Sequence, residues 1–132
     1  MSTQTVAETY KRTDGKHDFR VRSRVHVEFM SKQGYENEAD ARGAFVGLRV
    51  ASQRGTIALR FPDGGCTVST EKPTHILTVK PRKDGEWYFE ITHVNGHLIG
   101  YSRAYSETRQ CEEDARIFRE QLQYIPFEGQ EP

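Results

Sequence analysis

The sequence is poor in cysteine and proline, has no long hydrophobic run, and carries no excess of charge of either sign. Its 132 residues include two cysteines and five prolines, and 19 lysines and arginines balance 19 aspartates and glutamates. No apolar stretch approaches the roughly 20 residues needed to cross a bilayer. The N-terminal residues lack the hydrophobic segment of a signal peptide. These absences predict a cytoplasmic protein with no membrane partner.

Catalytic and metal-binding motifs are missing as well. Cys66 and Cys111 are far apart and form no CxxC motif, which argues against a disulfide scaffold or a zinc module, so we expect two reduced thiols. The chain contains no nucleophile elbow, no phosphate-binding loop and no dinucleotide fingerprint. Cys111 falls at an apolar position of a predicted helix, where we expect it to pack inward. The sequence therefore predicts no enzymatic activity, no cofactor and no metal.

What the chain does contain is an internal repeat within a length that fits one domain. Sliding the sequence by 70 residues, with no gap, superposes Asp14-Gly15 on Asp84-Gly85, Phe19 on Phe89, Phe29 on Ile99, Tyr35 on Tyr105, and Leu48 on Phe118. The order of turn, strand and helix signals is the same in both copies. This order predicts a single domain over 1–132, with one repeat at about 7–61, a linker at about 62–74 and a second repeat at about 75–128.

Each copy has the pattern of three strands, a helix and a strand. In the first copy, Phe19 and Val21 point to one face of a strand, and Val27 and Phe29 to one face of the next. The period then changes to that of a helix that packs one apolar stripe inward. The predicted elements are strands at 7–11, 18–22 and 25–29, a helix capped by Asn37 and ended near Gly55, and a strand at 56–61.

The second copy repeats this order and predicts the fold class. Its apolar helix stripe is Cys111, Ala115, Phe118 and Leu122. The predicted elements are strands at 75–80, 86–92 and 97–103, a helix from about Glu107, and a closing strand at 123–128, where Pro126 requires a sheet edge or a strand end. We expect an α+β fold in which two tandem β-β-β-α-β repeats form one mainly antiparallel sheet, with two helices packed on one face.

A family resemblance supports the repeat. The matching features are Gly85-x-Trp87-x-Phe89-x-Ile91, the turn Asn95-Gly96, and then Ile99, Ser102, Tyr105 and Cys111. With these features the second copy resembles the YegP-like family, a bacterial and archaeal domain of unknown function. In the first copy His17 stands in place of the tryptophan, and residues 24–26 replace the Asn-Gly turn. The resemblance implies one sheet shared by both copies, helices on one face and terminal strands exchanged between the units. It implies no activity and no catalytic residues.

The face of the sheet opposite the apolar residues is the candidate binding surface. Arg20, Arg22 and Arg24 alternate along a predicted strand, a geometry that suits phosphates or a carboxylate-rich partner. The alternative is a solvated or internally paired face whose arginines are neutralised by Asp18, Glu28 and the acidic second half of the chain, residues 62–132. The full set of candidate binding residues on this face is Arg20, Arg22, Arg24, His26, Tyr88 and Glu90.

Two histidines flank a predicted hairpin loop. If the loop is the three residues Val94-Asn95-Gly96, His93 and His97 face each other across the strands. If it is the two-residue turn Asn95-Gly96, they lie on opposite faces. Two ligands do not make a metal site, and no neighbouring residue supplies a third and fourth.

Together these observations predict a small, monomeric interaction module without catalytic activity, whose open sheet face meets a protein partner. The alternative is a nucleic-acid-binding accessory protein that uses the arginine-rich face. The balanced charge argues against that alternative, because nucleic-acid binders carry a basic footprint.

Overall fold

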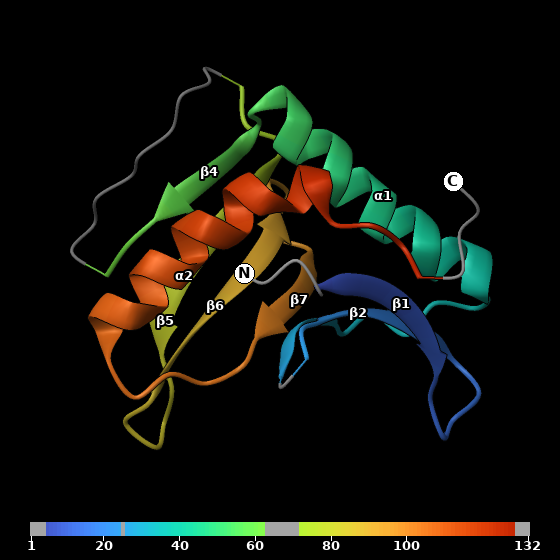
Figure 1. Ribbon diagram of the computed structural model, residues 1–132, viewed down its shortest axis with the longest axis horizontal. Coiled ribbons are helices and arrows are strands. Elements are labelled where there is room, and N and C mark those ends of the chain that lie inside the picture. The colour runs from blue at the N-terminus through green and yellow to red at the C-terminus, as the bar shows by residue number, and fades with distance from the viewer. Residues whose placement is uncertain (1–4, 25, 63–71, 129–132) are drawn as a thin grey trace.

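The computed structural model describes residues 5–24, 26–62 and 72–128, which form one seven-stranded sheet and two α-helices (Figure 1). The elements are β1 (Val6–Lys11), β2 (His17–Arg22), β3 (Val27–Ser31), α1 (Glu38–Arg54), β4 (Ile57–Arg60), β5 (His75–Pro81), β6 (Trp87–His93), β7 (Leu98–Ser102), α2 (Thr108–Gln121) and a 3-10 turn (Leu122–Tyr124). Neither helix of this described part is both long enough and apolar enough to cross a membrane.

The strands lie in the order β1-β2-β3-β7-β6-β5-β4, and each copy contributes a contiguous set apart from its last strand. Neighbouring strands are antiparallel except β4 and β5, which are parallel. Both helices cover one face of the sheet (Figure 1). The predicted α+β class with a mainly antiparallel sheet is therefore confirmed.

The closing segments of the two repeats are exchanged. Strand β4 belongs to the first repeat by sequence but pairs with β5 of the second. In return, Phe127 at the end of the second repeat forms a parallel bridge with Ala7 of β1. Two hydrogen bonds hold this bridge: the Ala7 amide donates to the Pro126 carbonyl at 2.9 Å, and the Glu128 amide donates to the Ala7 carbonyl at 2.7 Å. The prediction of a closing strand at 123–128 is wrong, because a 3-10 turn takes up its first residues and leaves one bridge.

Helix α1 begins and ends where the sequence predicts. The Asn37 side-chain oxygen accepts a hydrogen bond from the Asp40 amide at 2.8 Å, which satisfies a free donor of the first turn. Gly55 ends the helix with a φ of 68°, a left-handed conformation that costs glycine little. Helix α2 begins one residue after Glu107, close to its predicted start.

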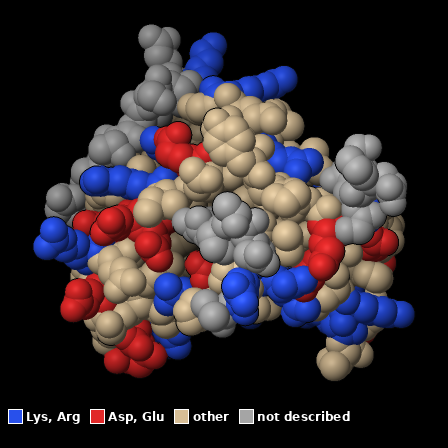
Figure 2. Space-filling model, viewed as in Figure 1, with Lys and Arg blue, Asp and Glu red and all other residues tan. Residues whose placement is uncertain are grey.

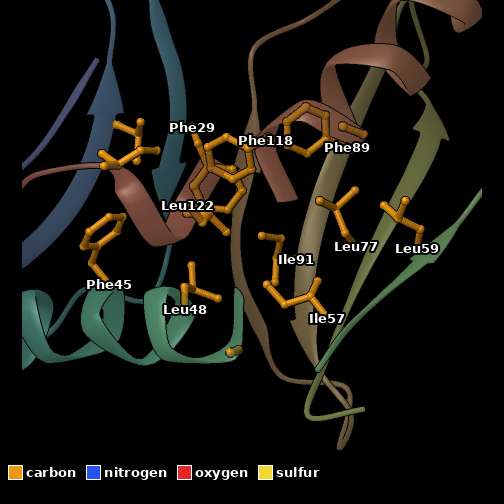
Figure 3. Packing of buried hydrophobic residues seen from close by; sticks show 14 of the residues in the cluster. Phe29, Phe45, Leu48, Ile57, Leu59, Leu77, Phe89, Ile91, Phe118 and Leu122 are labelled. Carbon is orange, nitrogen blue, oxygen red and sulfur yellow. The ribbon is translucent and has the colours of Figure 1, made fainter. Parts of the chain in front are cut away.

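The core is a single layer of side chains between the helices and the sheet (Figure 3). Phe29 is its centre, because its ring stacks on Phe118 of α2 at 5.1 Å between centroids and also contacts Phe19 and Phe89. One buried aromatic group thus joins the two repeats. The predicted helix stripe of Cys111, Ala115 and Phe118 is fully buried.

Strands β3 and β7 meet at a pseudo-twofold axis in the middle of the sheet. Their paired residues are Phe29 with Ser102, Met30 with Tyr101, and Ser31 with Gly100. A twofold axis through the Met30–Tyr101 pair relates each residue of β3 to the residue of β7 that lies 71 positions later in the sequence. The ungapped 70-residue alignment, which places Phe29 on Ile99, is therefore wrong in these strands, and the counterpart of Phe29 is Gly100.

Two compensating changes in loop length cause the shift. Residues 23–26 lie between the paired residues Arg22 and Val27 of the first repeat, whereas 93–97, one residue more, lie between the paired residues Thr92 and Leu98 of the second. Between these strands and the next matched pair, Tyr35 and Tyr105, the difference reverses, because 32–34 precede Tyr35 but only 103–104 precede Tyr105. Both tyrosines then occupy matched positions again, in bridges to His17 and Trp87.

Strand β3 begins at Val27, two residues later than predicted, after the loop formed by residues 23–26. A register shift between Val21 and Arg22 pairs Arg22 with Val27, so Val27 is 39% exposed while Phe29 is buried. The two residues do not share a face as predicted, because a bulge interrupts the period of two. Residue 25, Cys66 and residues 63–71 of the expected linker lie outside the described residues.

Candidate functional site

Arg20 and Arg22 stand on the open face of the sheet, opposite the helices, and both are paired with one carboxylate. The Glu8 side chain of β1 accepts hydrogen bonds from Arg20 at 2.5 Å and from Arg22 at 2.8 Å. Burial alone raises the pKa of Glu8, but the hydrogen bonds from the arginines outweigh it and lower the pKa to about 2. Arg22 also pairs with Glu128 at 2.9 Å. The neutralising acids are thus Glu8 and Glu128. Glu128 comes from the acidic half of the chain, as expected, whereas Asp18 and Glu28 pair with other residues.

Arg24 and His26 do not continue this series. Strand β2 ends at Arg22, so both residues lie in the turn to β3 and are exposed. The prediction that Arg24 alternates along the same strand is wrong, because the Ser23 amide already donates to the His26 carbonyl and closes the hairpin there. Of the six candidate residues, four therefore share the open face, namely Arg20, Arg22, Tyr88 and Glu90.

A groove of about 850 Å³ crosses the open face from β3 over β7 to β6. Its floor includes Met30, Tyr101 and Tyr88, and its walls are Val27 on one side and the β5–β6 turn from Pro81 to Asp84 on the other. The volume falls within the range of ligand pockets, about 300–1,000 Å³. Of these residues, only Tyr88 was predicted from the sequence as a candidate binding residue. Met30 and Tyr101 could have been found by the period of two, since they alternate with the buried Phe29 and Ser102.

The loop-length difference explains why this space is open. In the first repeat, the position of Tyr88 is held by Asp18, which is 2% exposed. The Asp18 carboxylate accepts hydrogen bonds from Ser31 at 2.7 Å, from the Gly34 amide at 3.0 Å and from Arg12 at 3.3 Å. Gly34 belongs to the connection that is one residue longer in the first repeat. In the second repeat this connection is shorter and Tyr88 points outward. No hydrogen-bond network like that of Asp18 therefore fills the corresponding space among the described residues.

Carboxylates around the groove are paired, whereas two lysines are not. Glu90 is held by Lys80 at 3.2 Å and by the Tyr88 hydroxyl at 3.4 Å, and Asp84 by Arg82 at 3.1 Å. Lys83 lies on the wall, and Lys32 lies over the Tyr101 ring at 5.4 Å. Within the described ranges neither lysine has an ion-pair partner. Elsewhere acidic and basic side chains are interleaved, as Figure 2 shows for one side of the molecule.

The far end of the groove is fixed by Arg103. Its guanidinium lies over the Tyr105 ring at 4.2 Å, donates to Glu28 of β3 at 3.2 Å and reaches Asp114 of α2 at 3.7 Å. Glu28 belongs to the first repeat and Arg103 to the second, so this network ties the repeats together. It also leaves the Arg103 charge compensated.

The hairpin histidines follow the three-residue alternative. The His93 amide donates to the His97 carbonyl at 2.8 Å around Val94-Asn95-Gly96, and Gly96 has a φ of 93°. The aromatic neighbour of His93 is His75 on β5, at 5.2 Å between ring centroids. Burial lowers the pKa of His75, and the neighbouring His93 lowers it further. Among the described residues no group of three or more His, Cys, Asp or Glu is placed to hold a metal ion.

Cys111 is fully buried, as predicted. Burial raises the pKa of its thiol to about 12, and the carboxylates of Asp114 and Glu112 add to the effect. A thiol in this environment stays protonated at neutral pH, so it is a poor nucleophile.

The fold has known counterparts among solved structures. The solution structure of yegP from E. coli, a protein of unknown function, superposes with a TM-score of 0.66 over 99% of both chains, at 15% sequence identity. This chain has the yegP fold. A UPF0339 protein from Shewanella oneidensis gives a TM-score of 0.64 at 15% identity, covering 95% of this chain and 91% of that one. No family model and no curated protein sequence matches the chain.

The match to the yegP fold extends over both repeats, so it confirms the resemblance found in the second copy and includes the degenerate first copy. At this identity the likeness concerns the fold alone. The function must therefore be argued from the groove and its charges.

Proposed function

We propose that this protein is a non-enzymatic interaction module that binds its partner in the open-face groove. The carrying observation is the groove itself: a concave, largely aromatic and aliphatic space of about 850 Å³ that the core does not need. Tyrosine and methionine are enriched at protein interfaces, and here both line the floor. The absence of a catalytic role rests on the sequence motifs and on the inert environment of Cys111.

The floor offers a direct reporter. The chain contains two methionines, Met1 and Met30, so labelling the methionine methyl groups with ¹³C gives two signals, one of them from the groove. We expect small aromatic fragments such as indole and phenol derivatives to shift the Met30 signal and to leave that of Met1 in place. The variant Val27→Trp fills the groove from its exposed wall and abolishes the shift. The matched control Val46→Trp lies on α1 at a similar exposure, 36% against 39%, and preserves it.

The proposal fails if no fragment moves Met30, or if the two tryptophan variants respond alike. Either result would mean that the space does not accept ligands.

The nucleic-acid alternative is tested by retention on heparin at low and high salt. Because Glu8 neutralises Arg20 and Arg22, we expect weak retention by the natural chain and stronger, salt-sensitive retention by Glu8→Gln. Strong salt-sensitive retention by the natural chain would favour nucleic acid as the partner instead.

A further inference from the structure

The shape of the groove suits a bulky apolar side chain. Val27 and Pro81 stand on opposite sides of a floor that contains Met30 and Tyr101. Interfaces draw most of their affinity from one or a few such anchors buried in a pocket. No strand edge is exposed inside the groove, since β3, β7 and β6 pair with one another across it. A bound segment is therefore held by side chains rather than by adding a strand to the sheet.

The side chains around this pocket carry more unpaired positive charge than unpaired negative charge. Two carboxylates near it, Glu90 and Asp84, are each bound by a cation of the same chain. Lys32 and Lys83 have no carboxylate partner in the part of the chain that the structure describes. Two uncompensated positive charges beside an apolar pocket are complementary to an occupant that carries acidic groups next to an apolar one.

The same contacts favour a peptide over a nucleic acid. Stacked bases need free aromatic faces, but the Lys32 ammonium lies over the Tyr101 ring. The Glu90 carboxylate, 15% exposed, is joined to Tyr88 and would also lie close to a phosphate backbone that crosses the floor.

We infer that the groove binds an acidic segment of a partner protein, with one large apolar residue seated between Val27 and Pro81 and flanking carboxylates paired with Lys32 and Lys83. This inference rests on the proposed function and adds the chemistry of the partner to it.

The test is a selection of random peptides displayed on phage against the full chain, followed by counter-selection on Val27→Trp. The expected survivors bind the natural chain and Val46→Trp, and carry one tryptophan, phenylalanine or leucine flanked by aspartate or glutamate. A synthetic peptide from this set loses at least about thirtyfold in affinity on the double variant Lys32→Glu/Lys83→Glu, since two surface charge pairs of roughly 1 kcal/mol each are lost. The control Lys11→Glu, an exposed charge reversal on β1 away from the groove, leaves the affinity unchanged.

Each of the other possible results would overturn either the acidic partner alone or the proposed function as well. Groove-dependent peptides that are neutral or basic, or that ignore the lysine reversals, overturn the acidic partner but keep the proposed function. Peptides that bind Val27→Trp as well as the natural chain overturn both. A dT oligomer that shifts Met30 and competes with the selected peptides shows that the occupant is a single-stranded nucleic acid, and overturns the inference.

Discussion

Gly100 is the position at which one added methyl group should cost most, because it faces Phe29 at the pseudo-twofold axis. A Cβ atom there would lie 2.4 Å from the Met30 carbonyl oxygen, 2.7 Å from a Phe29 ring carbon and 2.9 Å from the Ser31 Cα. Two of these three neighbours are backbone atoms of the paired strand, which cannot move without opening the β3–β7 ladder. The twofold arrangement would bring two side chains to this point, and there is room only for that of Phe29.

We therefore expect Gly100→Ala to destabilise the protein by about 3 kcal/mol, the upper end of the usual cost of overpacking. For a chain of this size the loss lowers the Tm by roughly 10 °C. Urea and thermal unfolding, followed by far-UV circular dichroism, measure the effect. The double variant Phe29→Leu/Gly100→Ala should recover none of the clash with the Met30 carbonyl, and so remain less stable than Phe29→Leu alone.

Gly43→Ala is the matched control. Gly43 lies inside α1, has an ordinary helical φ, and an added Cβ meets nothing within 4 Å. Alanine there should stabilise the helix by about 1 kcal/mol. If Gly100→Ala is as stable as the natural chain, the packing derived for the seam between the repeats is incorrect.

Three further changes test other parts of the structure. Phe127→Ala should cost about 3–5 kcal/mol in urea unfolding, because this 5% exposed ring closes the first repeat, whereas Tyr124→Ala, at 71% exposure, should cost almost nothing; equal effects would refute the exchange. The pKa of His75 is lowered in the folded chain, so its contribution to the free energy of unfolding should be fully present above about pH 6.5 and be lost as the pH falls below that value. We expect His75→Gln to reduce the loss of stability between about pH 7.5 and 5.5, and the exposed His97→Gln to leave that loss unchanged. Cys111→Ala should lower stability by about 1–2 kcal/mol, and a stable variant that has lost a measurable activity would contradict the inert role given to this thiol.

The strands, helices and core could be predicted because each depends on local periodicity. Phe19 and Val21, or Cys111 and Phe118, reveal their buried face through spacing alone. The exchange of terminal strands came from the family resemblance, since no local pattern tells β4 which strand it will join. The parallel pairing with β5 is a long-range outcome of the linker path.

The groove could not be predicted, and the reason lies in two single-residue length differences. An ungapped alignment hides them, because the extra residue in 93–97 is cancelled by the extra residue in 32–34. Between these points the alignment pairs the wrong residues and gives Phe29 an isoleucine as its counterpart. Arg20 and Arg22, though not Arg24, were correctly placed on the open face. Their partner Glu8 is on another strand, and cross-strand ion pairs depend on a register that sequence spacing does not fix.

The bridge between Ala7 and Phe127 has a consequence for how the chain is made. During synthesis the first repeat emerges from the ribosome early, but the segment that covers its outer strand is made only after almost all of the second repeat. During that interval β1 has no neighbour on its outer side, and the first repeat lacks the segment that covers its outer strand. Contacts so distant in sequence also close slowly. The last step of folding should therefore be the docking of residues 125–128, which depends on the arrival of the other end of the polypeptide rather than on either repeat alone.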